Sequence, residues 1–167
     1  MNFSDLKNEL SYIDHLVKEF NRVAPATNSV NDVLRAELSG LLLVAICAVY
    51  ENVIKKIMIE YADSVHGDFS YYIEKNYKKL NSKISKEDLC KYLKLFSNAK
   101  ATNFTNEMLA VQTKLGGIHP NEKYSPLLDW RHAYAHSKTP QTTIEEAYKH
   151  HRYSKHIIYA FNRAINS

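Results

Sequence analysis

Apolar residues recur every three or four positions at the start of the chain. In an α-helix, this spacing places the side chains on one stripe of the surface. The stripe predicts a first amphipathic helix of about six turns. Its members are Phe3, Leu6, Leu10, Ile13, Val17, Phe20 and Val23. Pro25 ends this helix, because proline has no backbone N–H to donate.

A second, longer helix is predicted from residue 31 or 32 to about residue 63. Good helix formers fill this segment, and Gly40 is its only glycine or proline. Residues 38–49 are apolar on nearly all sides, which is typical of a helix in the middle of a bundle. The most apolar run, residues 41–50, has ten residues, whereas a membrane span needs about 20. We therefore expect a buried core helix and no membrane partner.

Caps and turn residues divide the middle of the chain into three shorter helices. We expect Asp68 to cap a third helix and the Ser85-Lys-Glu-Asp capping box to open a fourth. A fifth helix is expected from about Asn103, and Gly116-Gly117 is a strong signal for its end.

Two further helices are predicted after these glycines. Ser125, followed by Pro126, is expected to cap the sixth helix. Thr142 and Thr143 each stand three residues before a glutamate, which predicts the cap of a last helix that runs to about Ile165.

The chain lacks the alternation of apolar and polar residues that is typical of strands. Apolar residues make up 45% and charged residues 24% of its 167 residues, which are globular values. A chain of this length fits one domain with its own core. We therefore predict a single all-α domain over residues 1–167, an irregular up-and-down bundle of about five to seven helices.

The cysteines and the charge bear on location and partners. Cys47 and Cys90 form no C-x-x-C pair and suit a reducing cytoplasm, and the first residues lack the layout of a signal peptide. The net charge is +4, and residues 71–100 carry 8 basic and 3 acidic groups. This excess permits an anionic partner such as nucleic acid, although a lysine-rich solvated face is the commoner explanation.

The stretch D-W-R-H-A-Y-A-H holds the densest candidate chemistry. Arg131, His132 and His136 lie within six residues at the end of the expected sixth helix. One interpretation is structural, since cations near a helix C-terminus are stabilised by a few tenths to about 1 kcal/mol. The other is a site, because arginine binds phosphate and histidine transfers protons near neutral pH.

A metal site is the weaker interpretation of these histidines. His132 and His136 could share an ion, and His150 and His151 on the last helix make a four-histidine site conceivable. A catalytic zinc site needs three converging ligands, however, and the motif supplies two. We therefore expect neither a metal nor another cofactor. The rival is a metal-dependent hydrolase, which activity in the presence of chelator would exclude.

Metal-free cleavage of RNA fits the residue types better. Attack by the 2′-hydroxyl of RNA requires a base, an acid for the leaving oxygen and a cation for the charge on the phosphate. One chain offers Arg131 and His136 about 140° apart around an ideal helix. A two-fold dimer that faces two motifs toward each other would supply a pair of each residue.

The pattern R-x4-H in W-R-H-A-Y-A-H resembles the R-x4-6-H signature of HEPN domains, at the expected end of the penultimate helix. The stretch L-R-A-E-L-S-G-L-L-L-V-A-I-C-A-V-Y-E-N-V-I-K-K-I is similar to the long second helix of the HEPN-like nucleases of the RiboL-PSP and MAE types. The resemblance implies a metal-independent endoribonuclease that acts on RNA and builds its cleft across a homodimer. It also implies a role as a toxin or in antiviral or stress defence, with a cognate antitoxin as partner.

The resemblance assigns roles by position. Arg131 and His136 match the catalytic pair, and His132 matches the supporting polar position, where relatives often have asparagine or aspartate. Ser137 stands where a glycine often follows the final histidine. Glu51 resembles an acidic position on the second helix that orients the motif arginine. Its structural alternative is an ion pair with the lysine one turn later.

Four residues of the last helix, His150, His151, Arg152 and Lys155, could extend a phosphate-binding surface. A solvated charged face explains them more simply. The alternative to a nuclease is a non-catalytic module of the same fold that binds RNA, a nucleotide or a partner protein. The intact R-x4-H motif favours the enzyme.

Overall fold

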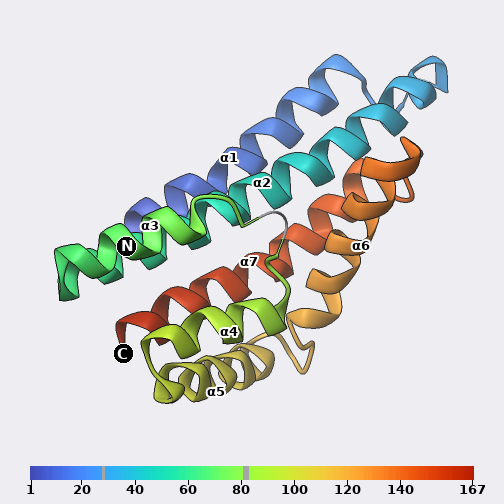
Figure 1. The fold of residues 1–167 in the computed structure, drawn as a ribbon. Helices are drawn as coiled ribbons and strands as arrows, with labels where there is room; N and C mark the ends of the chain where they lie inside the picture. Colours follow the sequence, from blue (N-terminus) through green and yellow to red (C-terminus); the bar gives the residue numbers. More distant parts are fainter. Residues whose placement is uncertain (28, 81–82) are drawn as a thin grey trace.

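The computed structural model describes residues 1–27, 29–80 and 83–167. These residues form seven α-helices and one short 3-10 helix, without a strand (Figure 1). The all-α prediction is therefore confirmed. In chain order the elements are α1 (Phe3–Val23), η1 (Ser29–Asn31), α2 (Asp32–Val65), α3 (Gly67–Tyr77), α4 (Lys86–Phe96), α5 (Asn98–Lys114), α6 (Asn121–Ser137) and α7 (Ile144–Asn166).

α2 is the central helix of the fold. It packs against α1, α3, α6 and α7, and α7 also packs against α5 and α6 (Figure 1). Each large apolar side chain that is fully buried contributes about 1.5–3 kcal/mol, so the α2–α7 contact is a main source of stability. Both helices contribute fully buried side chains to the core, among them Leu43, Ile46, Tyr50, Ile157 and Phe161.

The length and composition of α2 would also allow it to cross a membrane. Among the described helices, only the segment Ser29–Val65 passes this test, with a mean hydropathy of 1.9. The apolar window is thus longer than the ten-residue run seen in the sequence. Four helices of the same chain pack against α2. The core helix of a soluble protein passes the same test, so this observation is weak evidence for a membrane.

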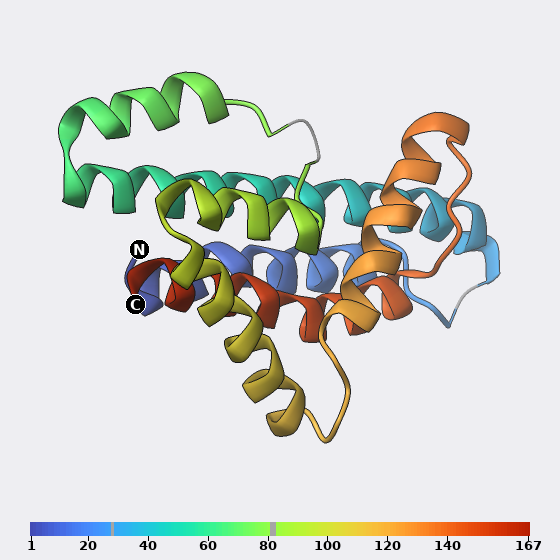
Figure 2. The same cartoon turned by 60° about the horizontal axis from the view of Figure 1, so that its bottom comes forward.

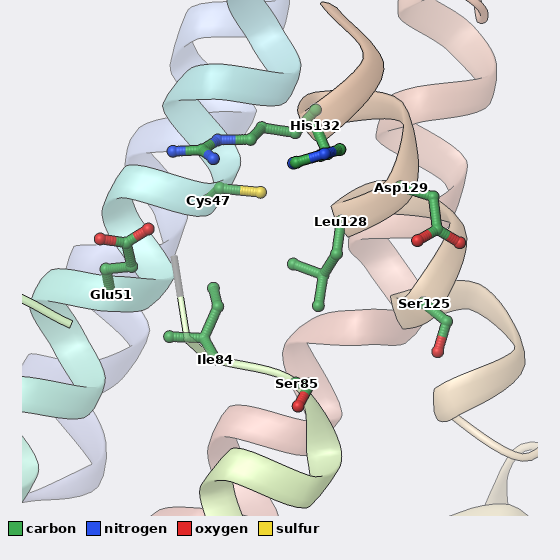
Figure 3. Close-up of a pocket in the computed structure, with 9 residues that line it drawn as sticks. Cys47, Glu51, Ile84, Ser85, Ser125, Leu128, Asp129 and His132 are labelled. Atoms are coloured by element: carbon green, nitrogen blue, oxygen red, sulfur yellow. The ribbon is translucent and has the colours of Figure 1, made fainter. Parts of the chain in front are cut away.

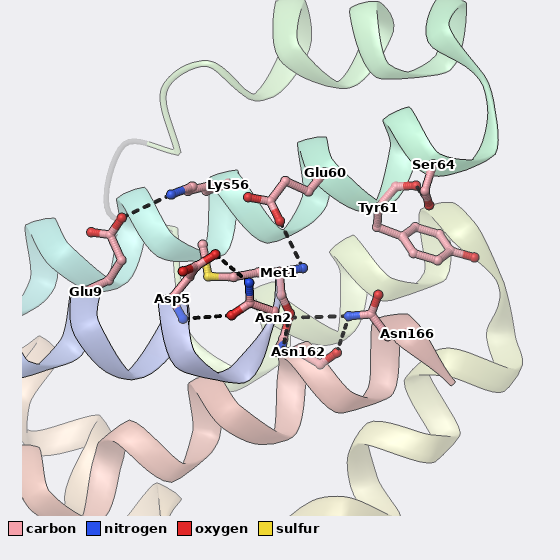
Figure 4. Close-up of polar contacts among 10 residues, drawn as sticks. All are labelled: Met1, Asn2, Asp5, Glu9, Lys56, Glu60, Tyr61, Ser64, Asn162 and Asn166. Carbon is pink, nitrogen blue, oxygen red and sulfur yellow. Dashed lines mark hydrogen bonds and ion pairs between the residues drawn. The ribbon is translucent and has the colours of Figure 1, made fainter.

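Polar contacts fasten the start of α1 to α2 and α7 (Figure 4). The Lys56 Nζ atom lies 3.2 Å from Glu9 Oε1, and the amino group of Met1 lies 3.0 Å from Glu60 Oε2. Asn162 Nδ2 donates a hydrogen bond of 3.1 Å to the backbone carbonyl of Met1. These contacts fix the end of the bundle that lies away from the C-terminal end of α6.

Two helix starts differ from the sequence prediction, and two agree with it. The Ser97 side chain accepts a hydrogen bond from the backbone of Lys100, so α5 begins ahead of the expected Asn103. His66 caps α3, because its ring Nδ1 accepts from the backbone N–H of Asp68, the residue expected to be the cap. The predicted Ser85 capping box and a cap at Thr143 are both present.

The start of α6 is a third correction. The helix begins at Asn121 rather than after Ser125, so Pro126 lies inside it. Its first turn is closed by Tyr124, whose backbone N–H donates to the Pro120 carbonyl at 3.1 Å. The Glu122 carboxylate also accepts from the backbone of the residue before Pro120, at 3.3 Å. Because Pro126 has no backbone N–H, one helical hydrogen bond is missing at this point of α6.

One side of α2 is exposed, although residues 38–49 are apolar on nearly all sides, a pattern that predicts a helix in the middle of a bundle. Leu41 is 51% exposed and Val44 is 39% exposed. Figure 2 shows α3 beside one half of α2 and α6 beside the other half. α6 covers Gly40 but leaves the next residue, Leu41, open to solvent. An apolar strip of α2 therefore remains uncovered next to α6.

Candidate active site

α6 packs closely against α2 at Gly40. The Tyr134 ring lies over Gly40 so closely that a Cβ atom at position 40 would collide with the ring carbons. The Tyr134 hydroxyl also donates a hydrogen bond of 3.2 Å to Glu37 Oε2. These contacts hold the motif-bearing helix against α2. The sequence analysis missed them, although a lone glycine in an apolar helix is a signal of close packing.

α6 is also seated on α7 and on the segment that precedes α4. The ring centroids of Trp130 and His150 lie 4.7 Å apart. The two ring nitrogens of His150 face the Lys123 carbonyl at 2.9 Å and Glu146 Oε1 at 3.1 Å. Near the start of α6, the Tyr124 hydroxyl donates to the backbone carbonyl that precedes Ser85. The motif is therefore carried by a helix that is fixed on three sides.

A cavity of about 290 Å³ opens beside the motif. Its walls come from α2, from α6 and from the segment that leads into α4 (Figure 3). Cys47 and Glu51 on α2 lie across the cavity from Leu128 and Asp129 on α6 (Figure 3). The lining residues are Cys47, Glu51, Ile84, Ser85, Ser125, Leu128, Asp129, Arg131 and His132. Two of the three motif residues thus share one cavity.

Arg131 and Glu51 both act on the Cys47 thiol. Cys47 is 1% exposed, and its burial raises the pKa of the thiol to about 12. The positive charge of Arg131 opposes this rise, and the negative charge of Glu51 adds to it. The charges of Arg131 and Glu51 therefore both act on the part of the cavity wall that Cys47 forms. Because the thiol stays protonated near neutral pH, Cys47 is unsuited to act as a nucleophile.

His132 and His136 form a pair on the exposed side of α6. Their ring centroids lie 4.4 Å apart with the ring planes inclined by 62°. His136 does not line the cavity, but it contacts His132, which does. The structure therefore joins Arg131, His132 and His136 into one continuous group. A cation beside two solvent-accessible imidazoles is a set of groups suited to phosphoryl transfer.

Glu51 lies in the same site and is half-buried. Together with Arg131, it lines both this cavity and an adjacent one. In the described part of the chain, Glu51 forms no ion pair with Lys55. Lys55 Nζ lies instead 3.4 Å from Asn52 Oδ1 and 3.5 Å from the Lys78 carbonyl. The local pair offered as the alternative role of Glu51 is therefore not formed.

The two histidines expected on the surface of the last helix are buried. His150 is 5% exposed and His151 is fully buried. His150 fixes α6, as described above, and His151 Nδ1 lies 2.9 Å from the Tyr50 hydroxyl inside the α2–α7 contact. Both residues face the core because they lie on the inner side of α7. The prediction that they extend a phosphate-binding surface is therefore wrong.

The two cations of that predicted surface lie away from the motif. Arg152 is exposed and lines a different cavity, between α1 and α7, together with Tyr148 and Lys149. That cavity shares no lining residue with the cavity of Arg131. Lys155 is half-buried and lines neither of the two. Any substrate contact of these residues would therefore be remote from the candidate site.

The four-histidine metal site is not formed. His132 and His136 lie together on α6, whereas His150 and His151 point into the core. Within residues 1–27, 29–80 and 83–167, no group of three or more histidine, cysteine, aspartate or glutamate side chains is placed to hold a metal ion.

Comparison with known proteins identifies the family. Residues 2–167 match the RiboL-PSP-HEPN family. No curated protein and no solved structure matches the chain. The family match spans nearly the whole sequence, including Glu51 and the motif on α6, and it agrees with the all-α fold. The chain therefore belongs to the RiboL-PSP-HEPN family.

Proposed function

We propose that the protein is a metal-independent endoribonuclease whose active site contains Arg131, His132 and His136. One observation carries this proposal. Arg131 and His132 line the same cavity, and the His136 ring lies against His132. The arrangement supplies a cation and two imidazoles within about one and a half turns of a helix, the groups that metal-free phosphodiester cleavage needs.

The proposed reaction is an internal transfer within RNA. One imidazole removes the proton of the 2′-hydroxyl, whose oxygen bonds to the adjacent phosphorus. The bond from phosphorus to the 5′-oxygen breaks, and a protonated imidazole gives that oxygen its proton. The guanidinium group of Arg131 stabilises the charge on the phosphate oxygens. The products are a 2′,3′-cyclic phosphate and a 5′-hydroxyl.

The uncovered strip of α2 supports a homodimer as the active form. Leu41 and Val44 on this strip lie beside the helix that carries the motif, and Ala48 extends the strip toward Glu51. A two-fold contact here would bring two copies of the motif toward a shared cleft, because such a contact uses the same surface on both subunits. Burying this strip removes apolar surface from water. One cleft would then draw histidines from both chains.

Variant proteins test the assignment in an RNA cleavage assay that contains excess chelator. The unmodified protein is expected to cut single-stranded RNA. Arg131→Ala and His136→Ala are expected to lose at least about a hundredfold in rate, because each removes a group that acts in the transition state. His15→Ala, which changes an exposed histidine on α1 that does not line the cavity, serves as the matched control. Salt-dependent RNA binding without cleavage would favour the non-catalytic module.

In the cell, we propose that the protein acts in the cytoplasm as a toxin or a defence component that a cognate antitoxin restrains. The family to which the chain belongs supports this role. Expression of the unmodified protein should arrest growth, and expression of the His136→Ala variant at the same level should not. Equal growth of the two cultures would contradict the toxin role. The endoribonuclease activity would then be decided by the cleavage assay alone.

A further inference from the structure

Three cavities form one continuous line that starts at the candidate active site. The first is the cavity beside the motif. The second has a volume of about 520 Å³ and shares Glu51 and Arg131 with the first. The third has a volume of about 440 Å³ and shares Lys79 and Leu80 with the second. Each cavity therefore adjoins the next, from Arg131 in the first to Tyr77 in the third.

The second cavity is strongly basic. Four of its lining residues are cations, and Glu51 is its one carboxylate. The four cations are Lys55, Lys78, Lys79 and Arg131. Lys78 and Lys79 are exposed, and neither forms an ion pair with any carboxylate in the described ranges. Their ammonium groups are thus available to an anion from solution.

Lys55 differs from Lys78 and Lys79 in the hydrogen bonds of its ammonium group. Its Nζ atom is held between Asn52 Oδ1 and the Lys78 carbonyl, at 3.4 and 3.5 Å. It is half-buried and lies one turn of α2 beyond Glu51. The Lys78 contact joins α2 to the residue that ends α3. The end of α3 and the middle of α2 therefore present their cations to the same space.

The third cavity adds an aromatic wall. Tyr77 and Tyr92 line it, and their ring centroids lie 5.6 Å apart in an edge-to-face contact. The Tyr92 hydroxyl donates to the Lys83 carbonyl at 2.7 Å, which fixes the backbone beside the cavity. Lys83 is exposed, whereas Lys91 is paired with Asp88 at 3.4 Å. The second cavity is therefore lined by cations, and the third combines cations with aromatic rings.

We propose that Lys55, Lys78 and Lys79 form a phosphate subsite that guides single-stranded RNA from Arg131 toward Tyr77. This inference rests on the proposed function, because it places the scissile phosphate at Arg131. The basic cavity binds the phosphates next to the scissile one, and the third cavity offers the half-buried ring of Tyr77 to an unpaired base. Cationic grooves with aromatic rings are how proteins bind single strands, since unpaired bases expose their faces for stacking. The lysines bind and position the strand; they do not take part in bond cleavage.

The subsite is tested by binding rather than by cleavage. The probe is a fluorescein-labelled, single-stranded 2′-O-methyl oligonucleotide of about 12 nucleotides, in which blocked 2′-hydroxyls prevent internal attack. The test variant carries Lys55→Ala, Lys78→Ala and Lys79→Ala. The control carries Lys7→Ala, Lys18→Ala and Lys114→Ala, which remove the same charge from exposed positions on α1 and α5 outside the three cavities.

The test variant is expected to bind at least tenfold more weakly, and the control variant less than threefold. The slope of log Kd against log salt concentration should be smaller by about 2 for the test variant. It loses three contacts between lysine and phosphate, and each such contact to a single strand contributes about 0.7 to the slope. A third variant with arginine at all three positions should bind like the unmodified protein. It keeps the charge and guards against a loss of folding, which circular dichroism checks in each variant.

Three results overturn the subsite. The first is equal weakening in the test and control variants, which indicates a general effect of net charge. The second is unchanged binding in the test variant, and the third is no binding of the probe by the unmodified protein. The outcome is separate from that of the proposed function. If binding depends on the three lysines but RNA is not cleaved, the subsite stands and the nuclease proposal fails. If RNA is cleaved but the test variant binds as tightly as the unmodified protein, the nuclease stands and the subsite fails.

Discussion

Gly40 of α2 lies directly beneath the ring of Tyr134 of α6. Tyr134 stands three residues after Arg131, so both side chains point to the same side of α6. The close approach of the two helices at Gly40 therefore determines how far Arg131 reaches over α2. It places the guanidinium group where it acts on Cys47 and shares a cavity with Glu51.

Gly40→Ala should destabilise the fold and impair the site. Inside a helix, this change alone would stabilise by about 0.5–1 kcal/mol. Here the added methyl group meets the Tyr134 ring, and overpacking of this kind costs about 1–3 kcal/mol. Urea unfolding measures the free energy. Gly67→Ala is the control, because nothing lies within 4 Å of a Cβ atom there. A Gly40→Ala variant as stable as the unmodified protein would show that the contact is not tight.

Stability should fall in mild acid because of His151. Burial is the main cause that lowers the pKa of this histidine from 6.5 to about 4, with Lys155 adding to the shift and Asp14 opposing it. The unfolded chain therefore binds a proton below pH 6.5 that the folded chain accepts only near pH 4. The free energy of unfolding should lose about 2 kcal/mol between pH 7 and pH 5 from this group.

His151→Gln isolates that contribution to the acid sensitivity. The variant loses the contact between the His151 ring and the Tyr50 hydroxyl, so it is expected to be less stable than the unmodified protein at pH 7. Its free energy of unfolding should, however, decrease less between pH 7 and pH 5 than that of the unmodified protein, by about 2 kcal/mol. His15→Gln, which changes an exposed histidine on α1, is the matched control for the substitution itself. Parallel pH curves for all three proteins would rule out the role of His151.

Cys47 should be unreactive in the folded protein and dispensable for cleavage. A pKa of about 12 in place of 9 leaves about a thousandfold less thiolate at a given pH. A Cys90→Ser variant, in which Cys47 is the only thiol, should react with a thiol reagent at pH 8 only after unfolding by urea. Rapid labelling of the folded variant would mean that the cavity wall opens at Cys47. Cys47→Ala should cut RNA at a rate close to that of the unmodified protein.

The apolar strip of α2 should hold the proposed dimer together. Leu41→Glu combined with Val44→Glu places charges on the strip and should yield a folded monomer without cleavage activity. Sedimentation equilibrium measures the mass, and circular dichroism measures the helix content. Leu109→Glu is the control, since Leu109 on α5 is 54% exposed and lies away from α2. An active monomer would contradict the composite cleft.

The long helices could be predicted from the sequence because their signals are local. The stripe of α1, the apolar length of α2 and the Thr143 cap of α7 each lie within a few residues of what they specify. The pair formed by His132 and His136 also follows from spacing on one helix, because residues four apart are neighbours. Each of these predictions depended on residues that are neighbours along the chain.

Features that depend on contacts between helices could not be predicted in this way. The burial of His150 and His151 is set by the rotation of α7 against α2 and α6, which charge pattern does not reveal. The early start of α6 depends on the caps at His119 and Pro120, which were less conspicuous than Ser125 and Pro126. The basic cavity is lined by residues of α2 and by residues at the end of α3, which are distant in the sequence and meet only in the folded chain.

The most direct test of the proposed enzyme uses a DNA oligonucleotide that contains a single ribonucleotide, incubated with the protein and excess chelator. If the 2′-hydroxyl is the nucleophile, the strand is cut once, after the ribonucleotide, and the new end carries a 2′,3′-cyclic phosphate. The all-DNA strand and the His136→Ala variant should give no product. Cleavage of the all-DNA strand, or ends with a 3′-hydroxyl and a 5′-phosphate, would contradict the mechanism, and an uncut strand would contradict the enzyme.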